Sequence, residues 1–150
     1  MIRETLNQIR TLVVSSADRF GKARQLARII RDQGQYRWVG VYDVGLEEVA
    51  IISWSGPSAP AYPTFSINRG LTASVISEKR PVIVGDVRND PRYLTAFGST
   101  LSEIIIPVLD SSTTVIGTID VESERANAFS VDDCELLEQC ARAALPLWLA

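Results

Sequence analysis

Residues 103–123 read EIIIPVLDSSTTVIGTIDVES and carry the strongest structural pattern in the chain. Two apolar runs rich in β-branched residues flank the polar segment 110–113, and this arrangement predicts an antiparallel β-hairpin. Glu103 begins the first run, while Asp120 and Glu122 close the second. Folding at the turn therefore brings three carboxylates to one end of the most hydrophobic segment.

The register of this hairpin follows from its turn. Counting outward pairs Leu109 with Thr114 and sets Glu103 opposite Asp120. Successive residues of a strand point to opposite faces, so Asp120 and Glu122 share one face of the sheet. Like charges directly opposite each other destabilise a sheet unless a cation lies between them, one acid is protonated, or water screens them.

Three interpretations of the acids stay open at this point. The acids could form a binding wall for the ammonium or another polar donor of a ligand, with Trp38, Tyr42 and Trp54 as the apolar side. They could also hold a hard metal ion, although the chain lacks the dense acidic loop of calcium sites. The third interpretation is a solvated hairpin end whose acids pair with Arg69, Arg88, Arg92 or Arg125.

Composition limits the class of protein and the kinds of chemistry that this chain can carry out. The chain has 150 residues, of which 46% are hydrophobic and 22% charged, and this predicts a globular protein with one substantial core. No stretch is long and apolar enough for a membrane helix, and no export signal is visible, so we expect a cytoplasmic protein. The absence of histidine excludes His-based acid–base catalysis and His-ligated zinc or haem. Cys134 and Cys140 fall in one predicted helix and are interpreted as ordinary helix residues.

Charge is uneven along the chain. Residues 1–37 contain eight Lys or Arg and three Asp or Glu, a balance of +5, against −3 for the whole chain. The arginines are spaced along predicted helices instead of being massed on one segment, so we expect a solvated helix face and no nucleic-acid partner.

Periodicity predicts the remaining elements. Apolar residues recur at helical spacing around residues 2–13 and 20–30, and Asp18 offers an N-cap for the second helix. The S-x-x-D sequence from Ser130 to Asp133 is a capping box for a final helix ending near Leu145. Further elements are expected as a hairpin of strands at 36–44 and 47–55, short strands at 64–67 and 81–84, a helix near 71–77, and a helix start at Asp90-Pro91. The sum is an α+β domain with an antiparallel sheet.

Several motifs then identify a family. They are W-V-G-V-Y (38–42), R-G-L-T-A-S-V (69–75), P-V-I-V-G-D-V-R-N-D-P-R-Y (81–93), S-E-I-I-I-P-V (102–108), I-G-T-I-D-V-E-S (116–123) and F-S-V-D-D (129–133). In this order and spacing the chain resembles a GAF domain over about residues 18–145. The resemblance implies a six-stranded antiparallel sheet with helices on both faces, a pocket for a small molecule, and frequent dimerisation through terminal helices. We therefore treat residues 1–150 as a single GAF domain, with an N-terminal helix in residues 1–17.

GAF domains differ in what they bind, and this chain departs from several types. It lacks the cysteine and histidines that bilin-binding members use, and the histidine that haem-binding members usually need. The signature of cyclic-nucleotide-binding members is matched only loosely, by Asn127, Phe129 and Asp133, because its lysine is missing and Cys134 follows Asp133. A cyclic nucleotide therefore stays an alternative ligand.

The chain is similar in more detail to GAF enzymes that reduce free methionine-(R)-sulfoxide. Their aromatic pair corresponds to Trp38 and Tyr42, and their carboxylates to Glu103, Asp120 and, conservatively altered, Glu122. Their thiol chemistry needs a nucleophilic and a resolving cysteine. The positions that resemble their cysteine sites are Thr72, Val82 and Ala96. The resemblance therefore implies the pocket of a reductase without its catalytic residues.

Together these observations predict a GAF domain that binds a small, amino-containing molecule as a sensory or regulatory module, without catalysis, cofactor or metal. The predicted ligand-binding residues are Trp38, Tyr42, Trp54, Glu103, Asp120 and Glu122. A homodimer is expected, and the stripe of Ile2, Leu6, Ile9 and Val13 is its predicted seam because the core does not obviously need it. The alternatives are a divergent or degenerate methionine sulfoxide reductase and a protein-interaction domain without a ligand.

Overall fold

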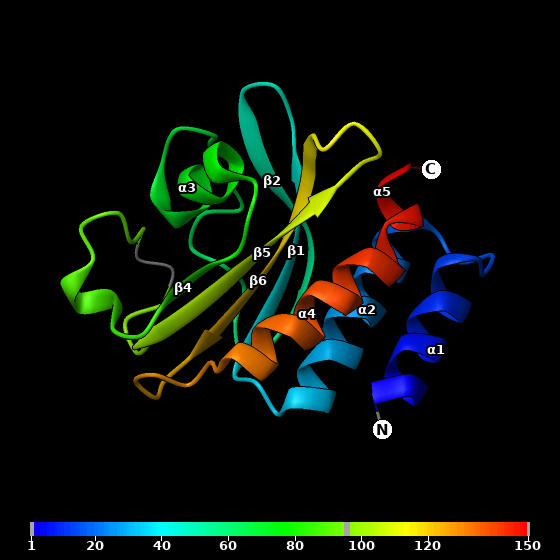
Figure 1. The fold of residues 1–150 in the computed structure, drawn as a ribbon, viewed down its shortest axis with the longest axis horizontal. Coiled ribbons are helices and arrows are strands. Elements are labelled where there is room, and N and C mark those ends of the chain that lie inside the picture. The colour runs from blue at the N-terminus through cyan, green and yellow to red at the C-terminus, as the bar shows by residue number, and fades with distance from the viewer. Residues whose placement is uncertain (1, 95–96, 150) are drawn as a thin grey trace.

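A computed structural model describes residues 2–94 and 97–149 of the chain. Its centre is a six-stranded antiparallel sheet in the order β3-β2-β1-β6-β5-β4. The long strands β5 and β6 run through the middle of the molecule, as Figure 1 shows. The strands are β1 (Trp38–Val44), β2 (Glu48–Ser55), β3 (Thr64–Ser66), β4 (Val82–Val84), β5 (Ser102–Leu109) and β6 (Val115–Ser123).

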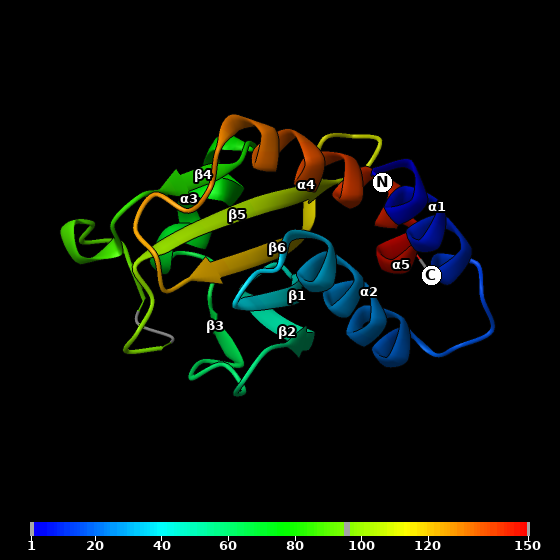
Figure 2. The same cartoon turned by 90° about the horizontal axis from the view of Figure 1, so that it is seen from below.

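Helices cover both faces of the sheet, as the α+β prediction requires. The larger layer consists of α1, α2, α4 and α5, and Figure 2 shows α2 and α4 lying along the sheet. On the other face, α3 packs with β4, β5 and the loop after β4. The bounds are α1 (Ile2–Val13), α2 (Arg19–Gly34), α3 (Gly70–Glu78), α4 (Val131–Ala144) and α5 (Pro146–Leu149), with a 3₁₀ turn η1 (Val87–Asn89). No helix within the described ranges combines the length and apolarity that a membrane span needs.

The predicted helix caps are confirmed. The Asp18 carboxylate accepts a hydrogen bond from the Gly21 amide at 2.7 Å and begins α2. The Ser130 hydroxyl accepts from the Asp133 amide, and the Asp133 carboxylate accepts in return from the Ser130 amide, which completes the capping box of α4. Proline cannot continue the hydrogen-bond ladder of a helix, and α4 accordingly ends at Ala144, before Pro146.

The register of the β5–β6 hairpin differs from the prediction by two residues. Glu103 lies opposite Glu122, and Asp120 lies opposite Ile105. One residue of the difference comes from the turn, where Leu109 pairs with Val115, and one comes from a bulge at Leu109. A shift of two preserves the face of every side chain, so the prediction that the three acids share one face is confirmed.

Two other predictions are wrong. The Asp90-Pro91 segment starts no helix; the preceding residues form η1, which Asp86 caps. The apolar stripe of α1 is not an exposed seam, because Leu6, Ile9 and Val13 are buried against α2 and α4. Only Ile2 at its start is substantially exposed. The stripe belongs to the core of the chain itself, since α1 shields the outer side of the α2–α4 layer.

Candidate functional site

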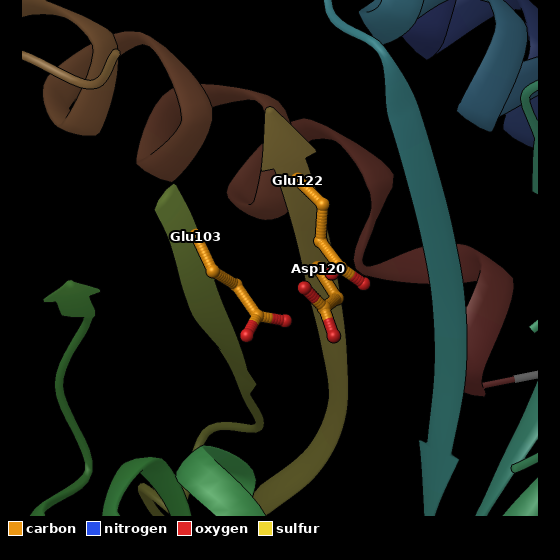
Figure 3. Close-up of side chains that lie close together, drawn as sticks. All are labelled: Glu103, Asp120 and Glu122. Atoms are coloured by element: carbon orange, nitrogen blue, oxygen red, sulfur yellow. The ribbon is translucent and has the colours of Figure 1, made fainter. Parts of the chain in front are cut away.

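Three buried carboxyl groups converge on the face of the sheet that α3 covers. Glu103 projects from β5 toward Asp120 and Glu122 of β6, as Figure 3 shows. One oxygen of each residue lies within 4.8 Å of one oxygen of each other residue. We call these three residues the carboxylate triad. All three are less than a tenth exposed, so the interpretation of a solvated hairpin end is wrong.

The pKa values of all three acids of the triad are raised, chiefly by burial. Burial, followed by the charges of Asp120 and Glu122, raises the pKa of Glu103 well above its usual range. Burial likewise raises the pKa of Asp120 to about 6 and that of Glu122 to about 8. The side-chain interaction between Glu103 and Asp120 raises the pKa of Glu103 further and lowers that of Asp120.

The triad is only partly satisfied by its neighbours. The Tyr93 hydroxyl donates to Glu122 Oε1 at 3.1 Å, and Thr100 makes a further side-chain hydrogen bond to Glu122. Asp120 Oδ1, by contrast, is buried and has no hydrogen-bond partner. The same is true of Thr118 Oγ1, two residues before Asp120 on the same face of β6. A buried acceptor without a donor is costly, so the Asp120 oxygen marks a place where a donor is missing.

No cationic side chain neutralises the triad within the described ranges. The ion pairs found there join Arg19–Asp43, Arg37–Glu124, Arg80–Glu78, Arg88–Asp86 and Arg92–Asp90. Arg88 and Arg92, two of the four arginines considered as partners from the sequence, are thus paired elsewhere on exposed loops.

A cavity of about 30 Å³ lies over the triad. This is small for a ligand cavity but exceeds the roughly 10–15 Å³ that a cavity needs to hold one water molecule. Its walls combine the acids with aromatic and aliphatic side chains from β1, β3, α3 and the loops after β2 and η1. The lining residues are Tyr42, Pro60, Tyr62, Phe65, Gly70, Leu71, Thr72, Leu94, Glu103, Ile105, Asp120 and Glu122. Four of the six predicted ligand-binding residues, Tyr42 and the triad, therefore face one cavity.

The other two predicted residues lie beside this cavity. Trp38 lines a neighbouring hollow of about 240 Å³, where its ring packs against Phe97 with centroids 5.2 Å apart. Trp54 belongs to the aromatic cluster around Trp38 and Tyr42 and lines neither space. Gly40 lets the two rings of β1 close over the strand, because a Cβ there would meet Trp38 at 2.3 Å and Tyr42 at 2.8 Å.

Thiol groups are remote from the triad in the described chain. Thr72 lines the cavity from α3, and Val82 is buried in the cluster beneath that helix; Ala96 lies outside the described residues. Cys134 and Cys140 belong to α4, on the opposite face of the sheet, and neither forms a disulfide. Burial raises the pKa of both thiols, to about 11 for Cys140, whereas reactive cysteines have lowered values.

The carboxylate oxygens of the triad are suited in kind to bind either a small organic cation or a hard metal ion. The triad offers three carboxylate ligands, which suit Mg²⁺ or Ca²⁺ in kind. Such ions usually take six or more oxygen ligands, however, and the other residues that line the cavity are mostly apolar. An organic cation with an apolar body fits this mixed lining better.

Sequence reasoning did not identify several residues of the site. Tyr62 and Phe65 come from a loop and a short strand far from the hairpin in sequence, whereas Tyr93 and Thr100 lie between η1 and β5. Tyr93 lies in the 81–93 motif, which gave a signal for the family but none for a contact with Glu122. The aromatic residues of the 56–65 region gave no periodic signal at all.

Comparison with known proteins gives a family and several distant relatives. The sequence-family model of the GAF domain matches residues 4–144 of this chain. GAF domain-containing protein A of Dictyostelium discoideum is 27% identical over 135 residues, 89% of this chain and 84% of its own. The free methionine-R-sulfoxide reductase of Saccharomyces cerevisiae is 28% identical over 70% of this chain and 59% of its own.

A solved structure extends the likeness to the whole fold. Free methionine-R-sulfoxide reductase from Neisseria meningitidis, in complex with its substrate, superposes with a TM-score of 0.87. It is 27% identical, and the match covers 99% of this chain and 88% of that protein. The family resemblance seen in the sequence is thereby confirmed, including its similarity to the reductase type.

Proposed function

The chain belongs to the GAF family of small-molecule-binding domains, and on that premise we propose that it is a sensory or regulatory module for a small, amino-containing molecule. The ligand lies against Tyr42 and the carboxylate triad, and the protein does not transform it. Binding at this cavity orders the loops around it and so provides the signal that a regulatory module needs.

The observation that carries the proposal is the orphaned acceptor Asp120 Oδ1 beside the cavity. A buried carboxylate cluster without a cationic side chain is unfavourable in an empty protein, and a ligand that supplies a donor or positive charge relieves that cost. Tyr42 and Phe65, with ring centroids 6.0 Å apart, offer an apolar and aromatic surface for the rest of the ligand.

Non-catalytic binding is favoured because the cavity has no described sulfur nucleophile. Reduction of a sulfoxide by the reductase route needs a thiolate at the sulfur atom and a second thiol to form the disulfide. Thr72 faces the cavity with a hydroxyl, and the two cysteines of α4 are separated from it by the sheet.

A degenerate free methionine-R-sulfoxide reductase is the second candidate. The observation in its favour is the likeness to two such enzymes at 27–28% identity, together with a tyrosine and three carboxylates at the cavity. On this alternative the chain keeps the binding site of an ancestral enzyme and has lost its turnover. A domain that only binds proteins is the third candidate, favoured by the small cavity volume.

Two measurements test the proposal. Thermal-shift screening against amino acids, their sulfoxides, amines and nucleotides should find a compound that raises the Tm, because a ligand specific to the native state stabilises it. Tyr42→Ala should abolish that shift, while the exposed control Leu46→Ala should retain it. If no compound in any class raises the Tm, the interaction domain is favoured instead.

The second measurement is a thioredoxin-coupled NADPH assay with free methionine-(R)-sulfoxide. We expect no turnover above that of the buffer, both for the wild type and for a Cys134→Ser, Cys140→Ser variant. Sustained turnover that needs either cysteine would overturn the non-catalytic assignment. The predicted homodimer is tested separately by light scattering after gel filtration, where a mass of one chain would contradict it.

A further inference from the structure

The geometry of the carboxylate triad narrows the chemical class of the ligand further than membership of the GAF family does. We propose that it binds an unsubstituted primary ammonium group in exchange for protons, so that the ligand is a primary amine and its uptake releases acid. This inference rests on the function proposed above. It adds the chemical class of the ligand and the coupling of binding to pH.

The number and direction of the acceptors favour –NH₃⁺. A primary ammonium has three N–H donors, and the three acids contribute three carboxyl groups within 4.8 Å of one another. Tyr93 and Thr100 already occupy Glu122 in part, whereas Asp120 Oδ1 has no donor. The unpartnered oxygen is buried at the cavity, so an entering N–H group would find an acceptor that the folded chain leaves open.

The volume of the cavity limits the size of the head group. About 30 Å³ is small for a ligand cavity and suits a compact head group such as –NH₃⁺. A trimethylammonium group carries three methyl groups in place of three hydrogens and therefore needs more room than –NH₃⁺. Methyl groups also cannot donate strong hydrogen bonds to Asp120 or Glu103.

The remainder of the ligand meets a different surface. Pro60, Tyr62, Phe65 and Leu94 line the cavity beside the triad, and Tyr62 is 42% exposed, so the loop after β2 forms its outer wall. These side chains are apolar or aromatic, and an alkyl or aromatic body next to the ammonium is the matching chemistry. Tyr42 adds a further aromatic side chain to this lining.

Proton exchange follows from the geometry of the empty site. Glu103 and Glu122 lie directly opposite each other, and one oxygen of Asp120 lies within 4.8 Å of an oxygen of each of them. The other titratable groups that line the cavity or contact the triad are Tyr42, Tyr62 and Tyr93; no Lys or Arg is among the described lining residues. With no fixed cation present, protons are the only described means of reducing the charge, and an ammonium ion makes at least one of them dispensable.

The experiment compares three probes of similar shape by isothermal titration calorimetry. They are n-butylamine hydrochloride, its neutral analogue 1-butanol, and butyltrimethylammonium chloride. The primary amine should bind at least about tenfold more tightly than either of the others, a difference of about 1.4 kcal/mol. Equal binding of butyltrimethylammonium would overturn the primary-amine class. Competition by millimolar MgCl₂ that abolishes amine binding would assign the triad to a metal ion instead.

Proton release is measured by titrating in phosphate and HEPES buffers, which differ in ionisation enthalpy. We expect about one proton released per amine near pH 7, and an affinity that rises by up to about tenfold per pH unit between pH 6 and pH 8. Butylamine stays charged there, because alkyl ammonium groups have a pKa of about 10.4. The change must therefore come from the protein, and identical enthalpies in both buffers would contradict the exchange.

Matched variants separate this inference from the proposed function. Glu122→Gln should lower amine affinity and proton release together, whereas Glu124→Gln, an equivalent change at a half-exposed acid of the same segment, should leave both unchanged. The Tm of each variant shows whether it is folded. If another small molecule binds at Tyr42 while amines do not, the regulatory function stands and the amine class fails. If no small molecule binds, both fail.

Discussion

The two faces of the sheet bury different kinds of side chain. On β6, Ile119 and Val121 point into the layer of α1, α2, α4 and α5, whereas Asp120 and Glu122 point toward α3. Residues next to each other in sequence thus enter an apolar core on one side and a charged cavity on the other. The face under α1, α2, α4 and α5, here called the helix-covered face, buries apolar side chains that stabilise the fold. The face under α3, here called the α3-covered face, buries carboxyl groups, and their burial is unfavourable until a ligand binds.

The largest expected effect comes from moving a charge to the wrong face. Val121→Asp places a carboxylate in the helix-covered core, where Val121 is fully buried among apolar side chains. We expect a loss of more than about 4 kcal/mol, enough to unfold a marginally stable domain. Circular dichroism and urea unfolding measure it, with Val121→Ala as the control for lost volume alone. A folded Val121→Asp protein with near-native stability would remove the distinction between the faces.

The next prediction concerns how the buried triad makes the stability of the folded protein depend on pH. A carboxyl group whose folded-state pKa is raised binds protons more tightly in the folded than in the unfolded state, so stability falls as pH rises from the unfolded to the folded pKa. For Asp120 and Glu122 this window runs from their ordinary pKa values of 3.8 and 4.5 to about 6 and about 8. The Tm of the ligand-free protein should therefore fall between pH 5 and pH 8.

Glu122→Gln should flatten this dependence and be more stable than the wild type at pH 8. Each unit of pKa shift corresponds to about 1.4 kcal/mol, so the gain is of the order of a few kcal/mol. Differential scanning fluorimetry at several pH values, with Glu124→Gln as the matched surface control, gives the comparison. A wild-type Tm that rises over this range would show that the acids are ionised and stabilised in the empty protein.

A third prediction concerns the helix-covered face where it contacts the site strand. The Trp148 indole N–H donates to the Tyr42 carbonyl at 3.0 Å, and its ring lies over Gly117, where a Cβ would meet Nε1 at 2.0 Å. Gly117→Ala should displace this ring and cost about 1–3 kcal/mol by overpacking. Gly98→Ala, where a Cβ would meet no atom within 4 Å, should change stability by less than about 0.5 kcal/mol. Chemical unfolding of both variants decides it; equal values would contradict the close approach.

The smallest effect concerns the cap of α4, the helix that lies across the apolar face. Ser130→Ala removes the acceptor of the Asp133 amide and should cost about 1 kcal/mol. Ser130→Thr retains the hydroxyl and should restore most of the loss. Because the cap is remote from the cavity, amine binding should not change. A change in affinity without a change in Tm would reveal a coupling between the two faces that the packing does not suggest.

Local chemistry made most of the fold predictable. The β5–β6 hairpin, the caps of α2 and α4 and the end of α4 at Pro146 depend on residues close together in sequence. The errors arose where distant packing decided the outcome. The α1 stripe has the same spacing whether it meets a partner chain or α2 and α4, and the bulge at Leu109 has no signal in the apolar run.

By itself, the sequence determined that Glu103, Asp120 and Glu122 lie on one face, because alternation along a strand survives a register shift of two. It also determined that no histidine, and no cysteine at the positions resembling thiol sites, is available to them. Only the tertiary structure decided that the triad is buried, that Asp120 Oδ1 lacks a donor and that Arg88 and Arg92 pair elsewhere. These properties depend on loops and helices that meet the hairpin from distant parts of the chain, and desolvation of a charge is set by those neighbours together.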